Sequence, residues 1–206
     1  QMVLLDVNPL SLDYLQKIIH RFSMQEYILG IEMADAVHYT IPEKYKPDIL
    51  VSETMKPGLV KEPQVSVISQ LLSQCGSNTI VVPECIIIDA CLLGNMINHP
   101  DAFQTLKTLL KFDAITAVQI NNKPEEVDVF GKGVTVILNN RPAALFSRLV
   151  LTTTINIYGG LQLGFKESSL TIPVPVMEIA TINKYPAQLL FQYQISGNPG
   201  FTVRLL

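Results

Sequence analysis

The pattern of hydrophobic residues changes near residue 95, and this change limits the folds open to the chain. Before it, short apolar runs alternate with segments of helical spacing; after it, short apolar runs separated by turns dominate. Alternating strands and helices are typical of an α/β unit with a parallel sheet, and a series of strands is typical of an antiparallel sandwich or barrel. We therefore predict an α/β unit over residues 1–94 and a β-rich unit over residues 95–206.

The first half contains four predicted strands and two predicted helices. The strands are 2–5, 27–33, 48–53 and 79–82, each a mostly apolar run of the kind found in buried parallel sheets. One helix follows Ser11, a good N-cap, with apolar residues at helical spacing up to Phe22. Pro63 opens the other as a first-turn proline.

The second half is predicted to consist mainly of strands. Residues 98–112 are predicted as a helix or an ordered loop. Gly159-Gly160 and Asn198-Pro199-Gly200 are turn signals between apolar runs. The predicted strands are 134–138, 149–158, 161–165, 189–195 and 201–205.

Charge and composition exclude several classes of function. The net charge is −3 and the basic residues are scattered, so we expect no nucleic-acid partner. The apolar stretch 79–93 is interrupted by Pro83, Glu84 and Asp89, so we expect no membrane span. Three cysteines without a Cys-x-x-Cys pair indicate reduced thiols and a cytoplasmic protein, or a nuclear one in a eukaryote. His99-Pro100-Asp101 lacks a second distant histidine after it, so we expect no metal site.

Asp6 is the first candidate binding residue. It lies between the first predicted strand and the first predicted helix. A carboxylate there can accept hydrogen bonds from both hydroxyls of a ribose, because α/β sheets bind ligands at the carboxyl ends of their strands. Aspartate also caps turns and helices, so both interpretations stay open.

The segment Ser52-Glu53-Thr54-Met55, with Glu62 nine positions after Glu53, carries the most specific pattern. It resembles the Ser-Glu-x-Met motif of protein arginine methyltransferases, whose second glutamate lies nine positions after the first. In that family the two glutamates grip the substrate guanidinium. The chemistry is reasonable, because carboxylates pair bidentately with the planar fork of a guanidinium.

Neighbouring segments extend the resemblance. Residues 2–6 are similar to the family's second strand with its ribose-binding acidic residue, and residues 32–36 are similar to the segment that lines the adenine. Residues 46–53 resemble the family segment that leads into the first glutamate. Residues 79–84 resemble a later strand of its sheet.

The resemblance implies an S-adenosylmethionine-dependent methyltransferase. Residues 1–94 would form a partial Rossmann-like methyltransferase domain, and residues 95–206 a β-rich substrate or dimerisation domain. Glu53 and Glu62 would be the catalytic residues that hold a cationic nitrogen acceptor, on a protein or a small molecule. The cofactor S-adenosylmethionine would contact Asp6, Asp35, Ala36 and Glu53.

The sequence also departs from the family. The glycine-rich cofactor loop, Asp-x-Gly-x-Gly-x-Gly, would lie before position 1, so we expect this stretch alone to be inactive. Open sheet edges would then favour a homo-oligomer. Lys56-Pro57 replaces the family's Gly-Tyr and would put a cation beside the carboxylates. The alternative hypothesis is a non-catalytic interaction or assembly module derived from a methyltransferase fold.

Overall fold

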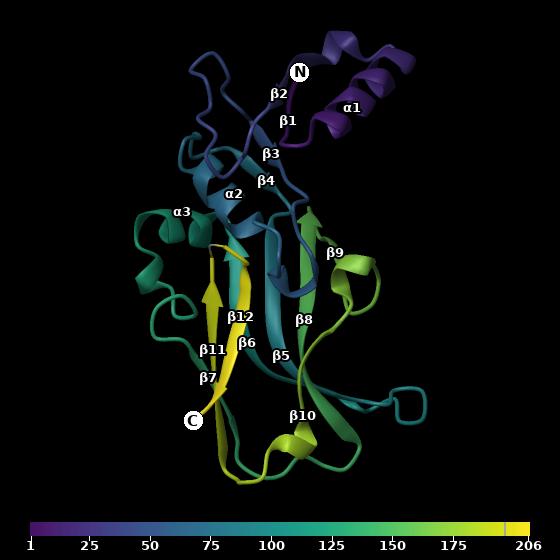
Figure 1. Cartoon of the computed structure of the whole chain (residues 1–206), viewed down its shortest axis with the longest axis vertical. Helices are drawn as coiled ribbons and strands as arrows, with labels where there is room; N and C mark the ends of the chain where they lie inside the picture. Colours follow the sequence, from purple (N-terminus) through teal and green to yellow (C-terminus); the bar gives the residue numbers. More distant parts are fainter. Residues whose placement is uncertain (196) are drawn as a thin grey trace.

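The computed structural model describes residues 1–195 and 197–206. Figure 1 shows α1, β1 and β2 at one end of the molecule and the long C-terminal strands extending away from them. In chain order the strands and α-helices are β1 (Met2–Asp6), α1 (Pro9–Arg21), β2 (Ile28–Met33), β3 (Ile49–Val51), α2 (Gln64–Leu72), β4 (Ile80–Val82), β5 (Cys85–Gly94), β6 (Phe103–Asp113), α3 (Ala114–Asn122), β7 (Val134–Leu138), β8 (Phe146–Tyr158), β9 (Leu161–Leu163), β10 (Val174–Glu178), β11 (Ala187–Gln194) and β12 (Gly200–Leu205).

The N-terminal part consists of two small parallel sheets. β1 pairs with β2, and β3 pairs with β4. α1 begins at Pro9 because the side chain of Asn8 accepts a hydrogen bond from the Leu10 N–H at 2.9 Å. It buries Leu12 and Ile19. The predicted alternation of strands and helices is therefore confirmed.

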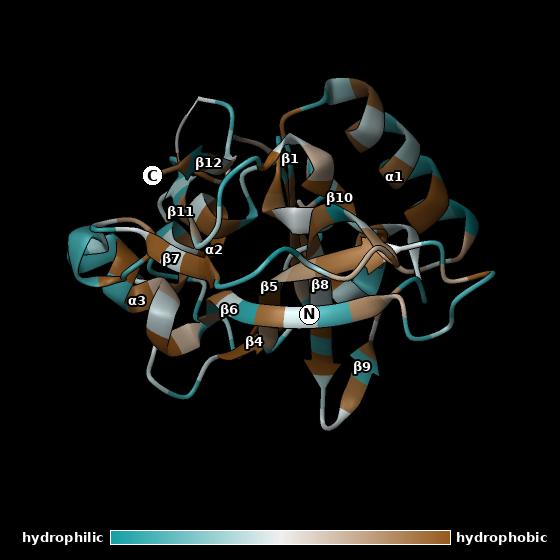
Figure 2. Ribbon diagram, turned by 90° about the horizontal axis from the view of Figure 1, so that it is seen from below, coloured by the Kyte–Doolittle hydropathy of each residue, from teal (hydrophilic) through white to brown (hydrophobic). Residues whose placement is uncertain are grey.

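The C-terminal part consists of two antiparallel sheets that share one hydrophobic core. One sheet has the order β10-β8-β5-β6, with β9 beside β8, and the other has the order β12-β11-β7. Ile88, Leu149, Leu189 and Phe191 are fully buried and belong to the same core cluster, so side chains from both sheets meet there. Figure 2 shows how hydrophobic the central strands β5 and β8 are. The predicted antiparallel β-rich unit is confirmed.

The prediction of Ser11 as an N-cap was wrong, because α1 begins at Pro9 and Asn8 caps it. The prediction of a helix or an ordered loop over residues 98–112 was also wrong, because β6 occupies most of this segment. The pairing of β6 with β5 is irregular at two points, where Leu106 and Leu109 have no partner residue in the register. Such β-bulges insert an extra residue and break the twofold alternation of a strand. The bulges therefore allow a strand to contain leucines at the i, i+3, i+4 spacing of a helix, here Leu106, Leu109 and Leu110.

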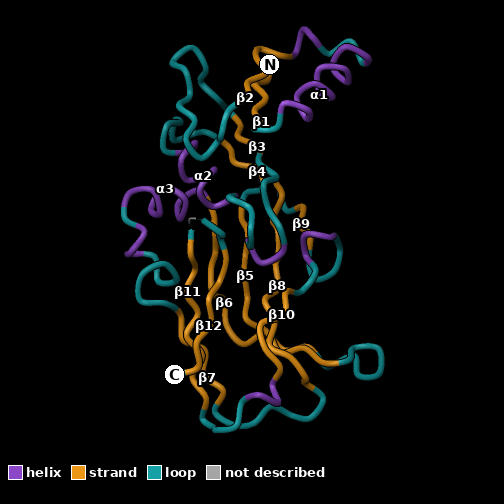
Figure 3. Tube along the Cα trace, in the orientation of Figure 1, coloured by secondary structure: helices purple, strands orange, loops and turns teal. Residues whose placement is uncertain are grey.

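Two helices pack against each other beside the larger β unit. α2 buries most of its residues, including Val65 and Ile68, and contacts α3. α3 begins where Asp113 accepts a hydrogen bond from the Thr116 N–H at 3.0 Å. The chain trace in Figure 3 shows both helices beside the upper ends of the long strands.

Within the described residues, no helix is both long enough and apolar enough to cross a membrane.

Candidate functional site

The two candidate glutamates lie within residues 52–64, which comprise the connection from β3 to α2 and the first residue of α2. The parallel pairing of β3 continues one residue past the strand, because the Ser52 N–H donates to the carbonyl of Val82 at 3.0 Å. Glu53 follows directly and is exposed. Glu62 is half-buried and lies two residues before the first residue of α2. We call residues 52–64 the two-glutamate loop.

The start of the loop is tied to its end by Gln64, which is 1% exposed. Its side-chain oxygen accepts from the Thr54 N–H at 3.0 Å, from Ser52 Oγ at 2.8 Å and from Thr54 Oγ1 at 2.9 Å. Its side-chain nitrogen donates to the carbonyl of Ser52 at 3.3 Å. The loop therefore closes on itself at its base.

The middle of the loop has an unusual backbone conformation. Gly58, Leu59 and Lys61 have φ values of 70°, 55° and 67°. Glycine adopts such values freely, but leucine and lysine do so at a cost of about 1 kcal/mol or more each. Leu59 is completely buried in the core cluster, which offsets this cost.

Three hydrogen bonds fasten the loop to the β unit. The Gly58 N–H donates to Thr153 Oγ1, the Tyr193 hydroxyl donates to the Leu59 carbonyl, and the Lys61 N–H donates to the Pro199 carbonyl, each at 2.7 Å. Burial raises the pKa of the Tyr193 phenol above its usual value, so this hydroxyl stays protonated as a donor. The positions of the glutamates thus depend on strands from the far half of the sequence.

Glu62 forms an ion pair within the loop. Lys56 Nζ lies 3.1 Å from Glu62 Oε1, and the two side chains are 52% and 35% exposed. The prediction that Lys56 would lie beside a candidate carboxylate is confirmed for Glu62. A pair this exposed contributes at most about 1 kcal/mol, so an incoming cation can displace the ammonium group.

The candidate cofactor residues Asp6, Asp35 and Ala36 lie at one edge of the β1–β2 sheet. Asp6 is paired with Met33 at the carboxyl ends of these strands, and the Ala34 N–H donates to the Asp6 carbonyl at 3.1 Å. The structure therefore brings the Asp35-Ala36 turn next to the end of β1. This edge is where parallel sheets bind nucleotides.

Both aspartates also stabilise local turns. Asp6 Oδ1 accepts from the Asn8 N–H at 2.8 Å, and Asp35 Oδ1 accepts from the Val37 N–H at 3.0 Å. His38 Nε2 lies 4.0 Å from Asp35 Oδ2. The turn-capping interpretation of Asp6 is thus observed, and a carboxylate with a second oxygen can cap a turn and accept from a hydroxyl at the same time.

Sequence reasoning missed the residues that hold the loop: Gln64, Thr153 and Tyr193. Thr153 and Tyr193 lie inside predicted strands, and nothing in their local sequence distinguishes them from core residues. Gln64 offered a weak signal, since a glutamine in the first turn of an apolar helix is a polar residue on a buried element. Its burial could not be predicted without the tertiary contacts.

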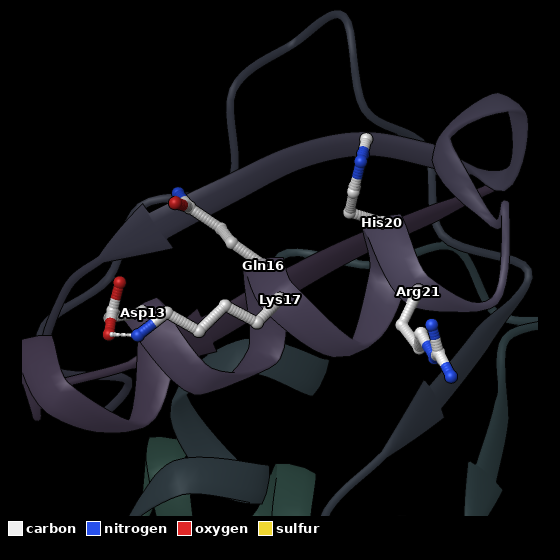
Figure 4. A pocket seen from close by; sticks show the side chains of 5 residues that line it. All are labelled: Asp13, Gln16, Lys17, His20 and Arg21. Carbon is white, nitrogen blue, oxygen red and sulfur yellow. Dashed lines mark hydrogen bonds and ion pairs between the residues drawn. The ribbon is translucent and has the colours of Figure 1, made fainter.

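Two surface depressions lie elsewhere. One is lined by residues of α1 alone, Asp13, Gln16, Lys17, His20 and Arg21, and Figure 4 shows Asp13 paired with Lys17 there. The other lies between β6 and β7 and contains Lys107 and Lys132. Neither contains a predicted site residue. In the part of the chain that the structure describes, no three His, Cys, Asp or Glu side chains are grouped to hold a metal ion.

Neither a protein-family model nor a curated protein sequence matches the chain. Solved structures do. The chain is similar over 99% of its length to 81% of a chain in the Trypanosoma brucei PRMT1 enzyme–prozyme heterotetrameric complex with AdoHcy, at 13% identity and a TM-score of 0.60. It is similar over the same share to 83% of a PRMT6 crystal structure, at 9% identity and a TM-score of 0.59. The chain is also similar over 99% of its length to 84% of a PRMT6–SAH crystal structure, at 8% identity and a TM-score of 0.55.

These likenesses show a fold like that of protein arginine methyltransferases: a mixed α/β part followed by an antiparallel β part. At such low sequence identity they establish the fold alone.

Proposed function

We propose that the chain is part of an S-adenosylmethionine-dependent methyltransferase that modifies a cationic nitrogen, with the two-glutamate loop as its acceptor site. The observation that carries the proposal is the loop itself. Its two carboxylates, nine positions apart, flank a segment in which Leu59 and Lys61 have positive φ and which hydrogen bonds with Thr153 and Tyr193 hold in place. Backbone strain that the surrounding structure maintains beside two carboxylates is typical of a functional site.

The residues take the following roles in this proposal. Glu53 and Glu62 pair with the acceptor cation and orient its nitrogen, so their contribution is positioning and electrostatics. Asp6 accepts hydrogen bonds from the ribose, and Asp35 with Ala36 contacts the adenine. Their common position at the carboxyl ends of β1 and β2 supports this assignment. When bound, S-adenosylmethionine supplies the methyl group.

The ion pair between Lys56 and Glu62 adds a condition for acceptor binding. Its ammonium group occupies Glu62, so an acceptor must displace it before both carboxylates are available. A guanidinium, with five donors, can engage both glutamates and compensate for the lost ion pair.

Titration of the chain tests the proposal in two steps. Calorimetry with S-adenosylhomocysteine is expected to show binding that Asp6→Asn weakens. An NMR titration with N-acetyl-L-arginine methylamide is expected to show binding that Glu53→Gln and Glu62→Gln each weaken about fivefold, as for a solvent-screened ionic hydrogen bond. Glu125→Gln, at an exposed glutamate that follows α3 and is not part of the loop, is the matched control. Wild-type protein that binds neither compound would refute the proposal for this chain.

A second candidate is a non-catalytic assembly module. It is supported by the Lys56–Glu62 pair and by a row of exposed apolar side chains on α1, Leu10, Tyr14, Ile18 and Phe22, spaced four residues apart. The PRMT1 neighbour from T. brucei is an enzyme–prozyme heterotetramer. This candidate predicts self-association, and a monomer in sedimentation experiments at micromolar concentration would count against it.

A further inference from the structure

Gln64 connects the two candidate catalytic glutamates. It is the first residue of α2 and is separated from Glu62 by Pro63 alone. It is 1% exposed, and the hydrogen bonds of its amide go to Ser52 and Thr54, the residues on either side of Glu53. One side chain thus links the backbone around Glu53 to the backbone that follows Glu62.

The chemistry of these bonds fixes the orientation of the amide. The Thr54 N–H can only donate and the Ser52 carbonyl can only accept, so the Gln64 oxygen must face the first and its nitrogen the second. These two backbone groups belong to the peptide units on either side of Glu53. Holding both restricts the direction in which the Glu53 side chain leaves the loop.

Gln64 does not serve its own helix. The N-cap position of α2 is Pro63, and no side chain caps the helix N-terminus. A buried amide is costly unless it is hydrogen-bonded, and an apolar side chain of equal size would fill the same space without that requirement. The polar group is therefore best explained by what it holds, which is the start of the two-glutamate loop.

We propose that Gln64 is the positioning residue that sets the spacing of the Glu53 and Glu62 carboxylates, and that this spacing selects a planar guanidinium over an ammonium ion. The inference rests on the proposed acceptor site. A guanidinium has five donors in a rigid planar fork and can engage two carboxylates at once only when their separation matches the fork, whereas an ammonium ion is a compact point charge with freely rotating donors. Loss of Gln64 should therefore affect the two cations unequally.

The test uses Gln64→Met, which keeps the side-chain volume and removes the hydrogen bonds. The matched control is Gln70→Met on the same helix, where the amide donates to the Tyr39 carbonyl at 3.4 Å. NMR titrations compare N-acetyl-L-arginine methylamide with N-acetyl-L-lysine methylamide, and hydrogen exchange is followed at the Thr54 amide. We expect Gln64→Met to weaken the arginine compound about tenfold and the lysine compound less than twofold, with faster exchange at Thr54.

The ratio of the two affinities separates positioning from damage to the fold. A partly unfolded variant loses both compounds in the same proportion, which would overturn the inference. So would a Gln64→Met variant that keeps the wild-type preference while Thr54 exchanges freely. If the wild-type protein binds neither compound, the proposed acceptor site fails, whereas wild-type binding with no change on Gln64→Met refutes only the role of Gln64.

Discussion

Residues 1–54 and residues 55–206 share one chain but bury their hydrophobic side chains to very different extents. Among the residues that the structure describes, Leu12 and Ile19 are the buried hydrophobic residues before Met55, whereas the core cluster begins at Met55 and continues into β11. Many apolar residues of the first region are exposed: Met2, Val7, Leu10, Tyr14, Ile18, Phe22, Tyr27, Leu29, Met33, Ile49 and Val51.

The buried core that stabilises the fold therefore lies in residues 55–206, whereas the candidate cofactor residues lie in residues 1–54. The candidate cofactor residues lie on the small sheet β1–β2, and a two-stranded sheet has little stability of its own. The two-glutamate loop is instead held by hydrogen bonds to strands of the large core. A partner that covers the exposed apolar residues would stabilise the first region most.

The largest expected effect contrasts one phenylalanine from each region. Phe191→Ala removes a fully buried ring and should lower the free energy of unfolding by about 3–5 kcal/mol. Phe22→Ala, at a ring that is 69% exposed, should change it by less than about 0.5 kcal/mol. Urea denaturation followed by circular dichroism measures both. Equal losses would mean that the two regions share one core after all.

Hydrogen exchange should sharpen the same contrast without mutation. Amides of β1 and β2 should open with a free energy at least about 2 kcal/mol lower than amides of β5 and β8, because few buried contacts restrain the small sheet. The measurement is native-state exchange at neutral pH, resolved by peptide or by residue. Uniform protection across both sheets would contradict the division.

Tyr193→Phe tests the anchor that joins the loop to the large core. The substitution removes the donor to the Leu59 carbonyl and leaves that buried group unsatisfied, which should cost about 1–2 kcal/mol. It should also speed exchange at the Leu59 and Lys61 amides more than in β8. Tyr158→Phe, at an exposed tyrosine, is the control.

The smallest expected effect depends on pH and compares two helix caps. Burial acts to raise the pKa of Asp113, but the Thr116 N–H and the Lys111 ammonium outweigh it and hold the pKa below its usual value. A depressed carboxyl pKa stabilises the fold above the unfolded value, about 3.9, and this stability is lost as the pH falls through the folded value. Asp113→Ala should thus cost about 1 kcal/mol at pH 7 and less near pH 3.

The matched cap in the other region is Asn8, which has no charge to titrate. Asn8→Ala should leave the main urea transition nearly unchanged at both pH values, because α1 lies outside the large core. Thermal and urea unfolding at the two pH values check both caps. A large shift of the main transition in Asn8→Ala would contradict the division between the regions.

Much of the fold could be predicted from the sequence wherever local pattern and tertiary environment agree. Residues 134–138 alternate as a strand should, and β7 has those bounds. β6 could not be predicted because its leucines have helical spacing in the sequence. The bulges that let them lie in a strand depend on pairing with β5. α3, which directly follows β6, was missed as well.

The candidate site shows the same limit. The glutamates and the nearby Lys56 could be chosen because the Ser52–Met55 segment and the spacing to Glu62 resemble a family motif, and such a motif is local in the sequence. Gln64, Thr153 and Tyr193 could not, because their roles depend on contacts between segments far apart in the chain. The roles of Glu53, Glu62, Asp6, Asp35 and Ala36 themselves stay predictions.

The hydrogen bond from Tyr193 to Leu59 has a consequence for how the protein is made. The two residues are 134 positions apart. A ribosome that adds about 5–20 residues per second takes about 7–27 s to make the intervening chain. During that time the two-glutamate loop has been synthesised but lacks the strand that holds it. The Tyr193 anchor is therefore acquired late in synthesis, and premature termination before β11 would yield a chain that has both glutamates and Gln64 but lacks this anchor.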